Sequence, residues 1–281
     1  MSRILEALRK VDTGHVPLAG TLPRAAEARA HAERRARGEA EAMAGAAAGP
    51  APLTGEADAA APVWRDSAVP GLPEDFQREL TGLRLQVDTA LAGRRPRVLL
   101  MTASTPGEGT TTVAASFARV LAQDPAARVL LVDANAHRPG VALFFGLPAG
   151  PGFAHALAAG LPVEDLVRPV ERHNLHVLPA MGGEVGAARL VSQPLVRRFL
   201  SEFGVRYDYV IFDAPAVLEA PETVVLGGAV DTSILVLRAA STKTGVVNRA
   251  VDSLAKAGVP LLGVVLNRRR LDIPEFIYKR I

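Results

Sequence analysis

The feature that most constrains the fold is a repeated change of hydrophobic period between residues 97 and 267. Short apolar runs with the length and composition of strands buried on both faces alternate with segments of helical spacing. The apolar runs are 97–103, 128–134, 175–180, 209–214, 233–239 and 261–267. The helical segments between them include 111–123, 187–204 and 244–257. This alternation predicts an α/β fold with a mostly parallel sheet covered by helices on both faces.

The N-terminal part of the chain differs in composition from the rest. Residues 1–12 have apolar side chains at helical spacing, which predicts a short amphipathic helix. Residues 13–72 are dominated by Ala, Gly, Pro, Arg and Glu, and such a stretch cannot bury enough apolar surface to fold. We therefore expect a flexible, disordered tether there. An amphipathic helix over 74–91 then opens the folded domain, residues 73–281.

Composition excludes several classes of function. The chain has no cysteine, which rules out thiol catalysis, disulfides and cysteine metal sites. We find neither a secretory segment nor an apolar run of the roughly 18 residues that a membrane span needs, so we expect a cytoplasmic protein. The net charge of +3 is concentrated in residues 268–281, which does not suit a nucleic-acid-binding face. The basic tail either touches a partner or anionic lipid, or is simply solvated.

Residues 104–112, STPGEGTTT, follow the strand at 97–103 and open a helix. That is the context of a P-loop, in which backbone N–H groups and a helix N-terminus face phosphates. Gly107 and Gly109 permit a tight backbone, and Thr111 stands where a hydroxyl would ligate Mg²⁺. Thr110 stands where such loops carry their lysine. The alternative is an ordinary glycine-rich turn between a strand and a helix.

Two further strands end in a carboxylate, at Asp133 and at Asp213. Carboxylates at the C-terminal ends of neighbouring parallel strands point into the crevice where open α/β sheets bind ligands. We therefore expect Asp133 and Asp213 to be the catalytic pair, one holding Mg²⁺ and the other orienting the attacking group. A helix cap is the alternative reading of a single strand-end aspartate.

Together these motifs resemble those of the bacterial tyrosine-kinase and polysaccharide co-polymerase family, relatives of the deviant-Walker ATPases. In that family the loop reads PGEGKS/T, the second motif resembles DADLRRP and the third resembles DTPP. Here they stand as PGEGTT, DANAHRP and DAPA. The resemblance extends to the C-terminal GVVLNRRRLDIPEFIYKRI, and MSRILEALRK looks like the N-terminus of members tied to exopolysaccharide export. It implies a P-loop-type fold over residues 74–281.

The resemblance also implies a site for ATP and Mg²⁺. Thr111, Asp133 and Asp213 would hold the Mg²⁺, and Asn267 would stand where relatives read the adenine. Arg138 falls on a basic position of the second motif. The nucleotide contacts would come from Gly107, Glu108, Gly109, Thr110, Thr111, Thr112 and Asn267.

One departure from the family pattern concerns the phosphate loop itself. Thr110 replaces the lysine that bridges the β- and γ-phosphates, and a charge-assisted hydrogen bond of that kind is worth about 1.5–3 kcal/mol. We therefore expect ATP and Mg²⁺ to bind weakly or not at all, and phosphoryl transfer to suffer more than binding. Lys243 is the one lysine to consider as a substitute.

Other departures concern phosphorylation and assembly. Kinase members carry a cluster of tail tyrosines, whereas this chain has three tyrosines in all. Tyr207 and Tyr209 adjoin a buried strand, which leaves Tyr278 as the phosphoacceptor candidate. The family's ring-forming ExxRxLR stands here as RELTGLR, which keeps Leu83 and Arg84.

The sequence thus predicts a tyrosine-kinase-like P-loop protein of exopolysaccharide or capsule biosynthesis and export, acting as a regulatory or scaffold partner with impaired nucleotide chemistry. Its expected partner is the cytoplasmic part of a membrane polysaccharide chain-length or export protein, which would hold it at the inner face of the cell membrane. A homo-oligomer is a second expectation, and no nucleic acid is expected. The alternatives are an active ATP-dependent tyrosine autokinase, which would explain why Thr111, Asp133 and Asp213 are retained, and a partition-type positioning ATPase.

Overall fold

The computed structural model of the protein describes residues 71–148, 151–170, 172–180, 186 and 191–268. The helix expected over 1–12, nearly all of the tether expected over 13–72, and Tyr278 lie outside these described residues.

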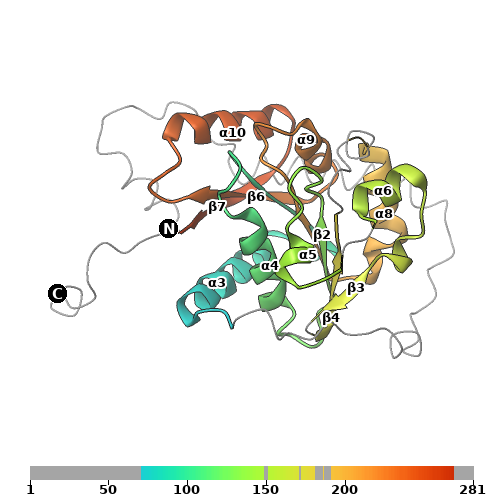
Figure 1. Ribbon diagram of the computed structural model, residues 1–281. Coiled ribbons are helices and arrows are strands. Elements are labelled where there is room, and N and C mark those ends of the chain that lie inside the picture. Colours follow the sequence, from blue (N-terminus) through green and yellow to red (C-terminus); the bar gives the residue numbers. More distant parts are fainter. Residues whose placement is uncertain (1–70, 149–150, 171, 181–185, 187–190, 269–281) are drawn as a thin grey trace. The chain divides into compact units, whose positions relative to one another are not determined.

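A seven-stranded sheet with the order β3-β4-β2-β5-β1-β6-β7 forms the centre of the described residues (Figure 1). All neighbouring strands are parallel except β3 and β4, which pair antiparallel. The parallel strands correspond to the apolar runs of the sequence, which confirms the expected mostly parallel sheet. They are β1 (Arg97–Ala103), β2 (Val129–Asp133), β4 (Arg172–Leu178), β5 (Tyr209–Asp213), β6 (Thr232–Arg238) and β7 (Leu261–Asn267), and the antiparallel strand is β3 (Arg168–Val170).

Helices cover both faces of the sheet, as expected. The helices α3 (Glu74–Ala90), α4 (Thr110–Leu121) and α5 (Val141–Phe144) share one hydrophobic cluster with one face (Figure 1). The opposite face packs against α6 (Phe153–Ala159), α8 (Gln193–Glu202), α9 (Pro221–Gly227) and α10 (Thr244–Lys256). Two short 3₁₀ turns, η1 (Val163–Asp165) and η2 (Gly204–Arg206), complete the elements.

The predicted helix over 187–204 is wrong at its start. Residues 187–190 lie outside the described residues, but Val191 and Ser192 are not helical and α8 begins at Gln193. The reason is Pro194, because proline is favoured in the first turn of a helix and disfavoured in its interior.

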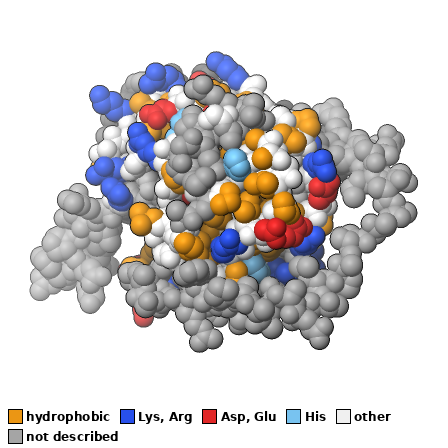
Figure 2. Space-filling model, turned by 45° about the vertical axis from the view of Figure 1, so that its right-hand side comes forward, with side chains coloured by type: hydrophobic (Ala, Val, Ile, Leu, Met, Phe, Trp, Pro, Cys, Tyr) orange, Lys and Arg blue, Asp and Glu red, His pale blue; other side chains and the backbone are white. Residues whose placement is uncertain are grey.

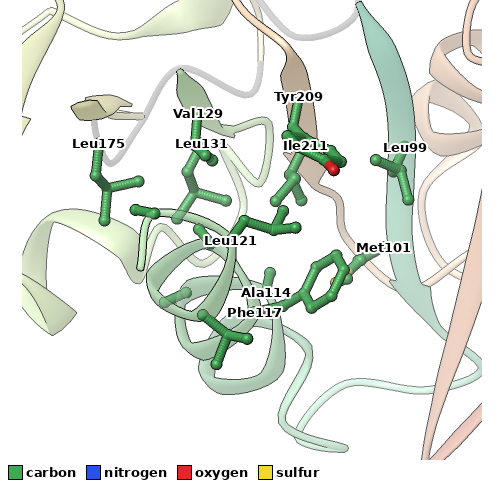
Figure 3. Packing of buried hydrophobic residues seen from close by; sticks show 14 of the residues in the cluster. Leu99, Met101, Ala114, Phe117, Leu121, Val129, Leu131, Leu175, Tyr209 and Ile211 are labelled. Atoms are coloured by element: carbon green, nitrogen blue, oxygen red, sulfur yellow. The ribbon is translucent and has the colours of Figure 1, made fainter. Parts of the chain in front are cut away.

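Alternation along the strands builds the core that holds the site in place. In β1, Leu99 and Met101 face α4, whereas Leu100 faces the opposite layer. On α4, Phe117 and Leu121 lie one turn apart and pack onto the sheet (Figure 3). All five side chains have no solvent exposure, and burying each contributes about 1.5–3 kcal/mol. This packing fixes β1 and α4, and therefore both ends of the loop between them.

The expectation of burial on both faces is wrong for β7. Every residue of this strand is partly exposed, and Leu266 keeps 37% of its surface. The reason is that β7 is the last strand of the described sheet and pairs only with β6. A position in the middle of the sheet is needed for full burial on both faces.

An ionic cluster fixes α3 to the sheet at the end where β1 and β5 begin. The Arg84 guanidinium donates to Asp124 at 2.8 Å, and the Tyr209 hydroxyl donates to Asp88 at 2.5 Å. Burial, followed by the hydrogen bond to Asp88, raises the pKa of Tyr209 to about 12. Arg84, a residue kept from the family's ring-forming motif, is thus engaged inside its own chain.

The described surface carries mixed charge. On the face shown in Figure 2, basic and acidic side chains lie beside one another with hydrophobic side chains gathered between them. The most exposed large hydrophobic side chain among the described residues is Leu143 of α5, at 86%. Within the described residues, no helix has the length and apolar content needed to cross a lipid bilayer.

Candidate nucleotide site

The loop between β1 and α4 has the backbone of a phosphate cradle. Gly107 and Gly109 have φ values of 82° and 93°, a left-handed region that glycine adopts without steric cost. A Cβ added to Gly109 would lie 2.1 Å from the Asn267 Nδ2, so this position has no room for a side chain. None of the described side chains caps the start of α4 at Thr110. The N–H groups of its first turn are therefore open to an anion.

The three threonines after the loop differ in their surroundings. Thr110 and Thr111 are partly buried, and Thr112 is exposed. Thr111 lies against the second motif, since a Cβ added to Gly140 would be 3.0 Å from the Thr111 Cγ2. Thr110, at the lysine position, offers a hydroxyl and no charge. Lys243 is exposed at the N-cap of α10 and no side-chain contact of it is seen within the described part of the chain.

Asp133 and Asp213 come together as the sequence predicted. They are partners in the parallel register of β2 and β5, strands that lie about 4.8 Å apart, and neither has any solvent exposure. Asp133 accepts three backbone hydrogen bonds, each 3.0 Å long, from Asn135, Gly140 and Val141. In contrast, no hydrogen bond of ordinary geometry from the described residues reaches either carboxylate oxygen of Asp213, although the Thr111 side chain lies near enough to favour its charged form.

The pKa values of the two aspartates are both raised. Burial raises the pKa of Asp133 to about 6, against the opposing effect of its three backbone donors. Burial, and then the charge of Asp133, raise the pKa of Asp213 well above its ordinary value, and the Thr111 side chain opposes this. Two adjacent buried carboxylates do not both ionise unless a cation neutralises them. The unpartnered Asp213 therefore fits a cation site.

Mg²⁺ suits this set of donors. No group of three or more His, Cys, Asp or Glu residues that could hold a metal is present in the described ranges. The Thr111 hydroxyl and the two carboxylates provide oxygen atoms only, which Mg²⁺ prefers, and Mg²⁺ commonly takes its remaining ligands from water and substrate phosphates. Thr111, Asp133 and Asp213 are thus the residues that would hold it. When bound, the ion would supply positive charge next to the phosphates.

The Glu108 side chain contacts its own loop. It is 3% exposed, and its Oε2 accepts hydrogen bonds from the backbone N–H groups of Ser104 at 2.7 Å and Thr105 at 3.0 Å. Its Oε1 accepts from the hydroxyl of Thr242, in the connection between β6 and α10. No motif predicted this contact, because Thr242 lies 134 positions further along the chain.

Asn267 also reaches the loop. Its Nδ2 donates to the carbonyl oxygen of Glu108 at 2.9 Å, and its Oδ1 accepts from the N–H of Arg268 at 2.8 Å. Asn267 ends β7, so the sheet brings it beside the phosphate loop. Adenine recognition by this residue stays a prediction.

Sequence reasoning missed a contact between the second and third motifs. The His137 Nε2 lies within hydrogen-bond distance of the Glu222 Oε1, where α9 begins. The Glu222 side chain is 9% exposed and that of His137 is 38% exposed, so this histidine is not simply a surface residue. Arg138 is exposed, and its backbone N–H donates to the Asn135 Oδ1 at 3.0 Å.

Comparisons with known proteins identify relatives of the chain. Residues 97–252 match the model of a family described as cellulose biosynthesis protein BcsQ. The chain is 31% identical over 190 residues to the tyrosine-protein kinase YwqD of Bacillus subtilis, which covers 68% of this chain and 80% of YwqD. It is 28% identical over 197 residues to the putative tyrosine-protein kinase EpsB of Ralstonia nicotianae, which covers 70% of this chain but 26% of EpsB. The chain therefore spans about a quarter of the length of that relative.

A solved structure shares the fold. The kinase domain of the Escherichia coli tyrosine kinase ETK superposes with a TM-score of 0.64 and 23% identity. The superposition covers 79% of this chain and 91% of that domain, so the two share an α/β fold over most of that domain.

Proposed function

This chain belongs to the bacterial tyrosine-protein kinase family of P-loop proteins, and from that premise we propose that it binds Mg²⁺·ATP weakly and serves polysaccharide biosynthesis as a regulatory or scaffold partner. The polysaccharide assignment is supported by the match to a cellulose biosynthesis family and by the resemblance to exopolysaccharide and capsule proteins.

The charge balance of the site is the observation that carries this proposal. Glu108, Asp133 and Asp213 are buried there, and no lysine or arginine is among the buried residues of the described ranges. An anionic triphosphate would enter without the lysine that normally offsets its charge. The lost charge-assisted hydrogen bond corresponds to about 10- to 100-fold in affinity, and to more in the transition state, where charge moves onto the transferred group. Binding would therefore depend strongly on Mg²⁺, and chemistry would be impaired.

The proposed partner is the cytoplasmic part of a membrane polysaccharide chain-length or export protein. The resemblance of the chain to the bacterial tyrosine-kinase and polysaccharide co-polymerase family supports this partner. In this proposal the protein lies at the inner face of the membrane through that partner.

An active tyrosine autokinase is the second candidate. It is favoured by the retained trio of Thr111, Asp133 and Asp213, since an inert site has no physical need for two buried carboxylates next to a hydroxyl. Tyr207 and Tyr209 are 4% and 3% exposed, so neither can reach a phosphate without unfolding. Incubation with Mg²⁺ and γ-labelled ATP would then label the wild type and not Tyr278→Phe, whereas the preferred proposal expects no label in either.

Equilibrium binding of Mg²⁺·ATP and Mg²⁺·ADP by calorimetry tests the proposal. Thr110→Lys restores the missing charge, and Gln123→Lys is a matched control that adds the same charge at an exposed position just beyond the opposite end of α4. We expect Thr110→Lys to bind ATP about 10- to 100-fold more tightly than the wild type and Gln123→Lys to change affinity little. Tight binding by the wild type, with no gain in Thr110→Lys, would show that the loop does not need the lysine.

A further inference from the structure

Glu108 is a buried carboxylate that is held by hydrogen-bond donors and, within the part of the chain that the structure describes, forms no ion pair with a lysine or arginine. Besides the N–H groups of Ser104 and Thr105 and the hydroxyl of Thr242, the backbone N–H of Arg238 lies 3.5 Å from its Oε1. Ser104 and Thr105 form the first turn of the phosphate loop, immediately after β1. The carboxylate therefore ties the start of the loop to the end of β6, the neighbouring strand.

The turn that follows β6 has a conformation that brings Thr242 to Glu108. Ala240 has a φ of 55°, a left-handed conformation that residues with a Cβ rarely adopt and that often marks a functional constraint. The backbone N–H of Thr242 donates to the carbonyl oxygen of Arg238 at 3.2 Å, which closes the turn. This turn places the Thr242 hydroxyl on the Glu108 Oε1.

The backbone of Glu108 is held from a second strand. Asn267, at the end of β7, donates to the Glu108 carbonyl oxygen at 2.9 Å. The N–H of Ala239 in turn donates to the carbonyl oxygen of Asn267 at 2.9 Å, which joins the two strand ends. Glu108 is thus held through its side chain by the β6 end and through its backbone by the β7 end.

We propose that Glu108 is a positioning residue whose carboxylate, bridged to Thr242, holds the phosphate loop in its nucleotide-binding conformation before the nucleotide arrives. The inference rests on the proposed nucleotide site. In a lysine-containing P-loop, the lysine side chain can bind the phosphates and the loop at the same time. Thr110 cannot do this because its side chain is short and uncharged. The Glu108–Thr242 bridge instead keeps the loop amides ordered, and binding avoids the cost of ordering them.

Two substitutions at Thr242 test the bridge without touching the phosphate loop. Thr242→Val keeps the shape and removes the hydroxyl, whereas Thr242→Ser keeps the hydroxyl. Thr244→Val is the matched control, since Thr244 is the exposed first residue of α10 and no side-chain hydrogen bond of it is seen in the described part of the chain. Each of these three substitutions is made in the full chain, once in the wild-type protein and once in the Thr110→Lys variant. The readouts are Mg²⁺·ATP affinity by calorimetry, thermal midpoint, and hydrogen exchange of the amides at 104–109.

We expect Thr242→Val to weaken Mg²⁺·ATP binding about tenfold and to speed hydrogen exchange in the loop, because a hydrogen bond to a charged group is lost. Thr242→Ser and Thr244→Val should stay within about twofold of their parent, which a purely steric role of Thr242 would not produce. Unchanged affinity in Thr242→Val, or equal losses in the serine and valine variants, overturns the bridge while leaving the nucleotide site intact. Failure of Thr110→Lys itself to bind ATP overturns the proposed function, and the bridge with it.

Discussion

Asp213→Asn is expected to stabilise the protein at alkaline pH when no divalent cation is present. At that pH the buried Asp213 carboxylate of the wild type must either be ionised without a hydrogen-bond partner among the described residues or stay protonated although the solution is alkaline. Asparagine has nearly the same shape and carries no charge. Asparagine still leaves a buried polar group, so the gain comes from removing the charge alone. Each unit by which burial raises a carboxyl pKa costs about 1.4 kcal/mol once the group ionises, so we expect a gain on the order of 1–3 kcal/mol in the free energy of unfolding. For a domain of this size that corresponds to a rise of roughly 2–12 °C in thermal midpoint.

The gain should depend on pH in a defined direction. Because the folded-state pKa of Asp213 lies above its ordinary value of 3.8, the native state binds this proton more tightly than the unfolded chain does. The stability it contributes is full below 3.8 and is lost as the pH rises through the raised folded-state pKa. The advantage of Asp213→Asn should therefore be small in acid and grow as the pH rises through the raised folded-state pKa of Asp213.

Mg²⁺ should act on the wild type alone. For a dissociation constant on the order of 1 mM, about 10 mM Mg²⁺ would stabilise the wild type by about 1.4 kcal/mol and Asp213→Asn by almost nothing. Urea unfolding across pH, with and without Mg²⁺, measures both effects. A variant less stable than the wild type at every pH, or an equal response to Mg²⁺ in both proteins, would refute the reasoning.

Asp133→Asn is the control for this experiment. Its Oδ2 accepts hydrogen bonds from the N–H groups of Gly140 and Val141 and its Oδ1 accepts one from Asn135, whereas an asparagine accepts on only one side of its amide. We therefore expect Asp133→Asn to fall below Asp213→Asn in stability at every pH, although it removes the same charge.

Further predictions concern the loop, α3 and the end of α4. Gly109→Ala should lose about 1–3 kcal/mol of stability in urea unfolding and weaken Mg²⁺·ATP binding, because its φ is 93° and the new Cβ would lie 2.1 Å from the Asn267 Nδ2; full stability would show that the loop relaxes freely. Tyr209→Phe should cost about 1.5–3 kcal/mol by removing a hydrogen bond to the Asp88 carboxylate, and tyrosine absorbance titration should show loss of a group that ionises near 12 in the wild type. Asn174→Ala should cost about 1–3 kcal/mol, since the Asn174 Nδ2 donates to three carbonyl oxygens where α4 ends; a midpoint equal to that of the wild type would contradict this.

Local pattern was enough to predict the long elements of the fold. The strand expected over 97–103 has those bounds in the structure, and so does the strand over 261–267, because both are unbroken apolar runs. The elements that were missed are short. Strand β3 has 3 residues and α5 has 4, too few to show a period of two or of 3.6.

In the candidate site, too, the residues that belong to a local motif could be predicted, whereas contacts between residues far apart in the sequence could not. Gly107, Gly109, Asp133 and Asp213 are placed by the backbone of loops and strand ends, so a motif at the right point of the chain predicts where they lie. The partners of buried side chains depend on contacts across the sheet. His137 and Glu222 are 85 positions apart, and no spacing in the sequence joins them.

The register of β2 and β5 has a consequence for protein engineering. Asp133 faces Asp213 because the two residues are paired in neighbouring strands. The distance between them is therefore set by the spacing and register of β2 and β5 and not by the lengths of the surrounding loops. A slip of one residue between the strands would turn one carboxylate to the opposite face. The loop after Asp213 could therefore be exchanged for that of a relative to redirect what approaches the phosphates, whereas the loop after Asp133 must keep the backbone N–H groups of Asn135, Gly140 and Val141 that hold its carboxylate.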